Sequence, residues 1–266
     1  MNIIQAKNLT KRFNGFTAVD NISFEVAEGE IFAFLGPNGA GKSTTIKMLT
    51  TLLAPSSGEM LLNGHNPAKN ANEVRRSFGI VFQDPSLDDE LTARENMEFH
   101  GVLYGVPKRE RTEKIATLLK FVDLADRQND LVKKFSGGMK RRLEIARGLL
   151  HHPKILFLDE PTLGLDPQTR NSMWAYLQEM NKNEGITIFF TTHYMEEAER
   201  IAGRIAIIDH GKIIAIGTAA ELKDRTKADT LEGAFLALTG KAIREEAGNA
   251  MDHLRMMRRS WTGKRN

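Results

Sequence analysis

The sequence contains no cysteine, which excludes disulfide bonds and thiolate metal sites but does not fix the compartment. It also has no apolar run near the roughly 18 residues that a membrane-spanning helix needs. The N-terminal segment MNIIQAKNLTKRF lacks the long apolar stretch of a secretory signal. We therefore expect the protein to stay in the cytoplasm unless a partner holds it at a membrane.

A strong charge of one sign is also missing from most of the chain. The formal net charge is +3, yet residues 241–266 alone hold seven basic and three acidic side chains, a net charge of +4. Residues 1–240 are therefore close to neutral, and we expect no nucleic-acid partner, because such partners require a basic face. The basic segment is interpreted as a solvated tail, with contact to an anionic leaflet or to a partner as alternatives.

What the sequence does contain is a glycine-rich loop between an apolar run at residues 31–35 and a helix-like segment at residues 45–53. This order predicts a phosphate-binding cradle, because glycines let backbone N–H groups converge on phosphate oxygens and the helix adds its positive dipole end. A flexible turn before a surface helix is the alternative, which the preceding strand disfavours. The loop comprises Gly36, Pro37, Asn38, Gly39, Ala40, Gly41, Lys42, Ser43 and Thr44.

Charged and hydroxyl side chains in and near this loop suit phosphate chemistry. Lys42 can reach the β- and γ-phosphates, and the Ser43 hydroxyl can ligate Mg²⁺. Asp159 and Glu160 follow a continuous apolar run at residues 155–158, and ligands of parallel sheets bind outside the carboxyl ends of the strands. Asp159 therefore suits the metal, directly or through water, and Glu160 suits the water that attacks phosphorus.

Two ring side chains follow predicted strands. His193 comes after the apolar run at residues 186–190, on the edge expected for Glu160, where it can hydrogen-bond the γ-phosphate or the water instead of being structural. Phe13 precedes the turn at Asn14 and Gly15 of an N-terminal antiparallel pair. It can pack in the core or stack on an adenine ring, and its own chemistry does not separate these interpretations.

Two further features each allow two interpretations. Gln83 follows the apolar run at residues 78–82 and can be merely solvated, or it can ligate Mg²⁺ or orient a water. Ser136 precedes two glycines and a strongly helical segment, which is an ordinary helix cap or a second anion-binding helix start. The residues of that start are Ser136, Gly137 and Gly138.

The order of these segments predicts an α/β fold with a parallel-sheet core and an N-terminal antiparallel β subdomain. An α-helical subdomain is inserted at about residues 85–150, where a capping box at Thr92 opens the first helix. Because this insertion is neutral and wholly helical, we expect it to contact another protein. The core is expected to end near Arg225, followed by a helical appendix and the basic tail at residues 226–266.

These motifs, taken in order, resemble the nucleotide-binding subunit of an ATP-binding cassette (ABC) transporter over about residues 9–225. The resemblance implies a P-loop NTPase core that forms the ATPase domain at residues 1–225, ATP as the nucleotide, and Mg²⁺. It rests on GPNGAGKST, Gln83, FSGGM, ILFLDE, the GLD sequence at residues 164–166, and His193.

The resemblance also implies particular roles. Phe13 would stack on adenine, Gln83 would link Mg²⁺ to the helical subdomain, and His193 would be the γ-phosphate switch. Asp166 would be the loop acid at the seam of a homodimer, in which Ser136, Gly137 and Gly138 of one chain close on the nucleotide of the other.

The signature reads FSGGM where the family usually has LSGGQ, so Phe135 and Met139 replace leucine and glutamine while the backbone donors persist. The GGMKRR form and the segment LEGAFLALTG at residues 231–240 are similar to the drug-exporter, daunorubicin-resistance-like branch. That similarity implies export of a drug, lipid or polysaccharide-like substrate through separate permease subunits, with this chain on the cytoplasmic face of the membrane.

Two rival functions remain open at this point. One is a soluble cassette ATPase that acts on ribosomes or nucleic acid without a permease, although the chain has neither a second cassette nor a long coiled-coil insertion. The other is a small-molecule kinase that shares only the cradle, which FSGGM and the Asp159-Glu160 pair argue against.

Overall fold

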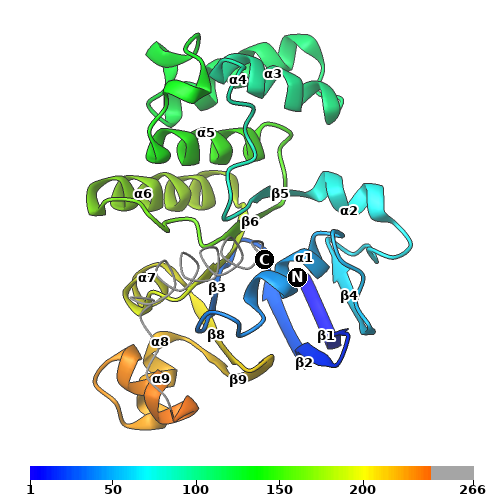
Figure 1. Cartoon of the computed structure of the whole chain (residues 1–266), viewed down its shortest axis with the longest axis vertical. Helices are drawn as coiled ribbons and strands as arrows, with labels where there is room; N and C mark the ends of the chain where they lie inside the picture. Colours follow the sequence, from blue (N-terminus) through cyan, green and yellow to red (C-terminus); the bar gives the residue numbers. More distant parts are fainter. Residues whose placement is uncertain (241–266) are drawn as a thin grey trace, which may run out of the picture.

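The computed structural model describes residues 1–240, which form two β-sheets and nine α-helices (Figure 1). The basic segment at residues 241–266 lies outside the described residues. Within residues 1–240, no helix combines the length and the apolarity that are needed to cross a bilayer.

The larger sheet has six strands, five of them parallel. Its strand order is β5-β6-β7-β3-β8-β9, and only β9 runs antiparallel to its neighbour. Every residue of the inner strands β6 and β7 is buried, as expected for strands covered on both faces. The strands are β3 (Ile31–Leu35), β5 (Phe78–Val81), β6 (Ile155–Asp159), β7 (Thr187–Thr192), β8 (Arg204–Asp209) and β9 (Lys212–Gly217).

The smaller sheet is antiparallel, with β1 (Asn2–Phe13) between β2 (Phe16–Ala27) and β4 (Ser57–Leu62). The turn predicted between the first two strands is confirmed, and Gly15 adopts a φ of 77° there, which favours glycine. Because the hairpin is tight, Phe13 and Phe16 are register partners at its tip.

Alternate residues of β3 enter different cores because side chains in a strand point to opposite faces. Phe32 and Phe34 join the hydrophobic cluster shared with the antiparallel sheet. Ala33 and Leu35 join the cluster shared with the inserted helices and with α6. The parallel sheet therefore lies between two hydrophobic layers, and its carboxyl edge remains free for a site.

All the helices except α6 and α7, which lie between the two ends of the molecule, fall into three groups in Figure 1. Helices α3, α4 and α5 lie together at one end of the molecule, α1 and α2 lie near the antiparallel sheet, and α8 and α9 lie at the opposite end. The predicted α/β architecture with its inserted helices is confirmed. The helices are α1 (Lys42–Leu49), α2 (Ala71–Ser77), α3 (Ala93–Leu103), α4 (Lys108–Phe121), α5 (Gly137–Leu149), α6 (Pro167–Glu184), α7 (Met195–Ile201), α8 (Ala219–Thr226) and α9 (Leu231–Thr239).

One predicted boundary is wrong, and it concerns the cradle. The helix expected over residues 45–53 begins at Lys42 and ends at Leu49. Gly41 precedes it in the left-handed conformation, so the last loop residues already form the first helical turn. Lys42 and Ser43 are therefore held on a helix and not on a free loop.

Candidate nucleotide site

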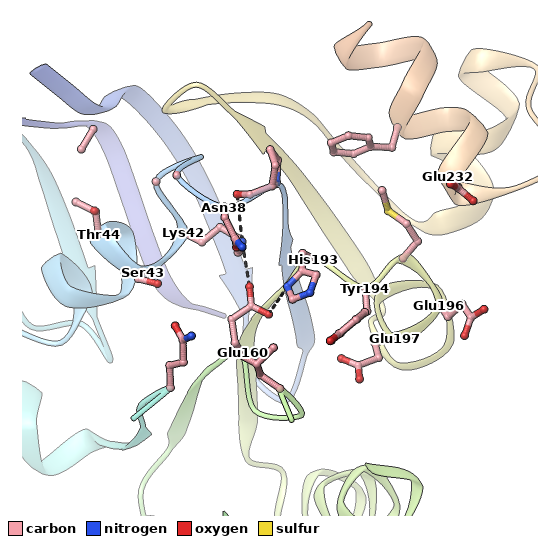
Figure 2. A pocket seen from close by; sticks show the side chains of 18 of the residues that line it. Asn38, Lys42, Ser43, Thr44, Glu160, His193, Tyr194, Glu196, Glu197 and Glu232 are labelled. Atoms are coloured by element: carbon pink, nitrogen blue, oxygen red, sulfur yellow. Dashed lines mark hydrogen bonds and ion pairs between the residues drawn. The ribbon is translucent and has the colours of Figure 1, made fainter. Parts of the chain in front are cut away.

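A pocket of about 970 Å³ opens at the carboxyl edge of the parallel sheet (Figure 2). The loops that follow β3, β5, β6 and β7 all reach it, since parallel strands end at the same edge. Eleven of the residues predicted for the site line this pocket. They are Phe13, Pro37, Asn38, Gly39, Gly41, Lys42, Ser43, Thr44, Gln83, Glu160 and His193.

The loop between β3 and α1 is packed so closely that two of its positions accept only glycine. A Cβ atom on Gly36 would lie 2.2 Å from the carbonyl oxygen of Ile208 on β8. A Cβ atom on Gly41, where φ is 107°, would lie 2.6 Å from the carbonyl oxygen of Ala18. The glycines thus let the backbone pass between its neighbours, while buried Ala40 lies underneath and does not line the pocket.

Lys42 folds back across this loop and is only 5% exposed. Its Nζ donates to the carbonyl oxygens of Gly36 at 2.8 Å and Pro37 at 3.3 Å. It also lies 3.0 Å from Glu160 Oε1, an ion pair without the angles of a directed hydrogen bond. The buried ammonium group is therefore compensated before any phosphate is present.

Glu160 lies between Lys42 and His193 in Figure 2. His193 Nδ1 is 2.9 Å from Glu160 Oε2, a distance at which the imidazole donates to the carboxylate. Burial alone raises the pKa of Glu160, but the His193 hydrogen bond and the charge of Lys42 outweigh it, so that pKa lies below its ordinary value. A carboxylate that is ionised and held on both sides is suited to accept a proton from a water in the pocket.

The side chain of Thr191 on β7 fixes the end of β6. The Glu160 N–H donates to Thr191 Oγ1 at 3.0 Å, and that hydroxyl donates to Asp159 Oδ1 at 2.6 Å. Glu160 itself has a φ of 48°, an uncommon left-handed conformation for this residue type. The strand edge thus turns Asp159 and Glu160 toward different neighbours.

Oxygen donors that suit Mg²⁺ lie together at the start of α1. Ser43 Oγ donates to Asp159 Oδ1 at 3.0 Å. Ser43 and Gln83 line the pocket, whereas Asp159 is buried behind Ser43 and does not line it. Residues 1–240 contain no cluster of three or more histidine, cysteine or acidic side chains that could hold a metal alone. Hydroxyl, carboxylate and amide oxygens fit Mg²⁺ that completes its shell with water and substrate phosphates.

Gln83 is positioned by α5, a contact that its sequence context does not indicate. The Arg141 guanidinium donates to the carbonyl oxygens of Phe82 and Gln83, the latter at 2.8 Å. Glu144 accepts from the Ser86 N–H at 2.7 Å, and Glu144 is 1% exposed. The loop after β5 and helix α5 are therefore joined by buried polar contacts.

The pocket also has an aromatic wall at the β1–β2 hairpin. Phe13 is 46% exposed and Phe16 is 61% exposed, and both line the pocket. Core packing is therefore not the role of Phe13. Sequence analysis missed Phe16, although its register opposite Phe13 follows from the two-residue turn. Exposed rings at a pocket are available to stack on a planar base.

The predicted features at Ser136 and Asp166 lie outside the pocket. Ser136 caps α5, with its Oγ accepting from Met139 N at 3.2 Å, and Asp166 caps α6 by accepting from Thr169 N at 3.0 Å. A Cβ atom on Gly138 would lie 2.7 Å from Thr169 Cγ2, so the two helix starts contact each other. Within one chain the pocket is thus built without Ser136, Gly137, Gly138 and Asp166.

Further parts of the wall come from residues that were not predicted for the site. Tyr194 and Glu197 follow His193, Arg170 comes from α6, and Phe235 comes from α9. The adjacency of Tyr194 to His193 was the one available clue. The others reach the pocket only because α6, α7 and α9 pack around the end of β7.

Comparisons with known proteins agree with this geometry. Residues 19–163 match the family model described as "ABC transporter". The chain is 42% identical to the linearmycin resistance ATP-binding protein of Bacillus subtilis (strain 168), over 91% of this chain and 76% of that protein. It is 43% identical to the daunorubicin/doxorubicin resistance ATP-binding protein of Streptomyces peucetius, over 86% of this chain and 69% of that protein.

Two solved structures are also similar. The ATP-binding subunit of an ABC transporter has a TM-score of 0.82 and 30% identity, and the match covers 89% of this chain and 99% of that one. A dimeric ATP-binding cassette bound to ADP and Pi in a post-hydrolysis state has a TM-score of 0.73 and 28% identity, with 81% and 98% covered.

Proposed function

Because the chain belongs to the ABC transporter family as an ATP-binding and ATP-hydrolysing subunit, we propose that it powers export of a drug-like compound through separate membrane subunits. Drug resistance in the names of two relatives supports export. The pocket described above is a nucleotide site, and under this proposal the transported compound is bound and selected by the membrane subunits. The nucleotide pocket therefore does not distinguish export of a drug from export of a lipid or polysaccharide-like compound.

The observation that carries the proposal is the line of contacts from Lys42 through Glu160 to His193. A γ-phosphate entering the cradle competes for Lys42 and frees Glu160 to accept a proton from the attacking water. His193 is then close enough to contact the same phosphate or water. Mg²⁺ held by Ser43, Asp159 and Gln83 would neutralise phosphate charge in the pocket.

We infer that the functional unit is a homodimer in which each pocket is completed by the other chain. The helix starts at Ser136 and Asp166 contact each other but do not line the pocket of their own chain. Ser136 and Gly137 are exposed, and the first backbone N–H groups of a helix lack intrahelical partners, so the start of α5 can act as a phosphate grip. A two-fold arrangement puts the grip of each chain on the nucleotide of the other, and the similar cassette with ADP and Pi is dimeric.

Peripheral attachment to the cytoplasmic face of the membrane, through permease subunits, follows from the same proposal. The inserted helices α3 to α5 are the expected contact with the permease, since the buried link from Arg141 to the Gln83 loop joins them to the pocket. In domain terms, residues 1–225 form the ATPase unit and residues 226–266 form the appendix and tail.

Purification of the tagged full-length chain from detergent-solubilised membranes tests this function. A multi-span membrane protein should co-purify in stoichiometric amount, and cells with both proteins should accumulate less of an exported compound than cells with the Glu160→Gln variant. Recovery of the chain on ribosomes, with no membrane protein bound, would favour the soluble cassette ATPase.

A further inference from the structure

Glu197 on α7 is a carboxylate with only 3% exposure, and it has three polar partners. Its Oε1 accepts from Thr162 Oγ1 at 2.6 Å, and its Oε2 accepts from Thr192 Oγ1 at 3.2 Å. Arg170 Nε lies 3.4 Å from Oε1 in an ion pair. Burial of a carboxylate is costly, so this set of partners indicates a defined role.

The partners of Glu197 belong to the segments that carry the proposed catalytic residues. Thr162 comes two residues after Glu160, and Thr192 comes directly before His193. Arg170 lies on the first turn of α6, whose cap is Asp166. One buried carboxylate therefore connects the ends of β6 and β7 with the start of α6.

Glu197 and its partners also contact the residues on either side of His193, which are Thr192 and Tyr194. Thr192 Oγ1, which donates to Glu197, also accepts from the Tyr194 N–H at 2.9 Å. The Arg170 guanidinium lies 4.8 Å from the centre of the Tyr194 ring, and that ring is 4.1 Å from the imidazole of His193. The residues before and after His193 are thus both held through Glu197.

We propose that Glu197 is a positioning residue that holds the His193 imidazole against Glu160 during ATP hydrolysis, an inference that rests on the proposed function. It acts through Thr192 and through Arg170 with Tyr194, and it does not itself contact the reacting atoms. Loss of its charge frees the loop at His193 while the cradle around Lys42 is unchanged. Misplacement of a reacting group by about 1 Å is enough to cost about 100-fold in rate.

Steady-state ATP hydrolysis by the full-length Glu197→Gln variant tests the inference, because glutamine keeps the volume but not the charge. We expect kcat to fall about 10- to 100-fold and the KM for ATP to change less than about twofold, since binding depends on the cradle. Glu179→Gln, which changes an exposed carboxylate on α6, is the matched control and should keep the wild-type kcat.

A double variant separates positioning from a merely structural role. If Glu197 acts through His193, adding Glu197→Gln to His193→Ala should lower kcat by less than about twofold further, because the residue that it positions is already gone. If Glu197 only stabilises α7, the two losses should multiply, and that result would overturn the inference. Thr192→Val, which removes one link and leaves Glu197 paired with Arg170, provides the same test should Glu197→Gln fail to fold.

The remaining outcomes are also decisive. A Glu197→Gln variant with wild-type kcat, beside a His193→Ala variant that has lost activity, overturns this inference and leaves the proposed function standing. A His193→Ala variant with full activity removes the proposed role of His193, and the inference falls with it.

Discussion

The ammonium group of Lys42 is buried among two carbonyl oxygens and the carboxylate of Glu160. A buried charge of this kind is stable only while it is paired. Phosphate oxygens can replace Glu160 as the partner, because they offer negative charge in the same place. Under our proposal, Lys42 therefore links nucleotide binding to the release of Glu160.

We predict that Lys42→Ala lowers the affinity for ATP at least about 10- to 100-fold, because the point charge that meets the β- and γ-phosphates is lost. Titration of the full-length protein with a fluorescent ATP analogue measures this. Lys47→Ala removes an exposed lysine from the same helix α1 and is the control that should bind normally. Unchanged affinity in Lys42→Ala would count against the cradle.

For Glu160→Gln we predict that turnover falls about 10²- to 10⁴-fold, because the amide cannot accept the proton of the water. ATP binding should persist, and a nucleotide-bound dimer should accumulate on size-exclusion chromatography with ATP. Because the pKa of Glu160 lies below its ordinary value, this carboxylate stays ionised in mild acid. Protonation of Glu160 should therefore not reduce turnover until the pH falls below the ordinary pKa of a glutamate. Full hydrolysis by the variant would show that another group is the base.

Residues within contiguous motifs could be predicted from their own chemistry, whereas isolated residues such as Phe13 and Gln83 were assigned to the site only through the family resemblance. Lys42, Ser43 and Glu160 follow apolar runs in spacings that have a chemical meaning. Thr191 and Glu197 act only because β6 lies beside β7 and α7 packs behind them. A single threonine or glutamate is too common for its neighbours to be inferred before that pairing is known.

Whether a strand or a helix could be predicted from the sequence depended on its length and its burial. Strands β3 and β6 were predicted almost to the residue, because continuous apolar runs mark strands buried on both faces. Helices α2 and α7 were missed, since seven residues span only two turns and show no clear period. Because Glu197 lies on α7, it was also not predicted as part of the site.

An interface between α3 and the end of α5 holds two half-buried histidines. The Tyr104 ring lies 3.9 Å from the His151 ring and 4.6 Å from the His100 ring. Burial, with the nearby charge of Arg147, lowers the pKa of His100 to about 3. Burial also lowers the pKa of His151 to about 4, although its contact with the carbonyl oxygen of Phe78 opposes the shift. Both imidazoles are therefore neutral in the folded protein at pH 7.

This interface predicts a loss of stability in mild acid. In the unfolded chain both histidines take up protons below a pKa of about 6.5, whereas the folded protein excludes them until about pH 4 or lower. The unfolded state then binds more protons, so the free energy of unfolding falls as pH decreases from 6.5 to 4. Urea unfolding of the His100→Asn/His151→Gln double variant should show a smaller fall over this interval. His152→Gln, at an exposed histidine, should behave like the wild type.

For the whole molecule, the parallel core and the inserted helices could be predicted because strands alternate with helical segments along the chain. The strand order could not, and neither could the position of α9, whose Phe235 reaches the pocket. Both depend on packing between segments far apart in the sequence. Under our proposal a complete site also needs two chains, because the helix start at Ser136 does not line the pocket of its own chain.

Mixing two inactive variants tests whether pockets are shared between chains. Lys42→Ala disables a cradle, and Ser136→Arg blocks a helix start with bulk and positive charge. A mixed dimer puts both defects in one pocket and leaves the other pocket intact, so random pairing should restore about a quarter of the wild-type sites. Phosphate release by the 1:1 mixture should therefore exceed that of either variant alone at the same total concentration. Circular dichroism melts of the Ser136→Arg variant are the control that tests whether it is folded. An active Ser136→Arg variant, or a mixture no better than its parts, would mean that each chain builds its pocket alone.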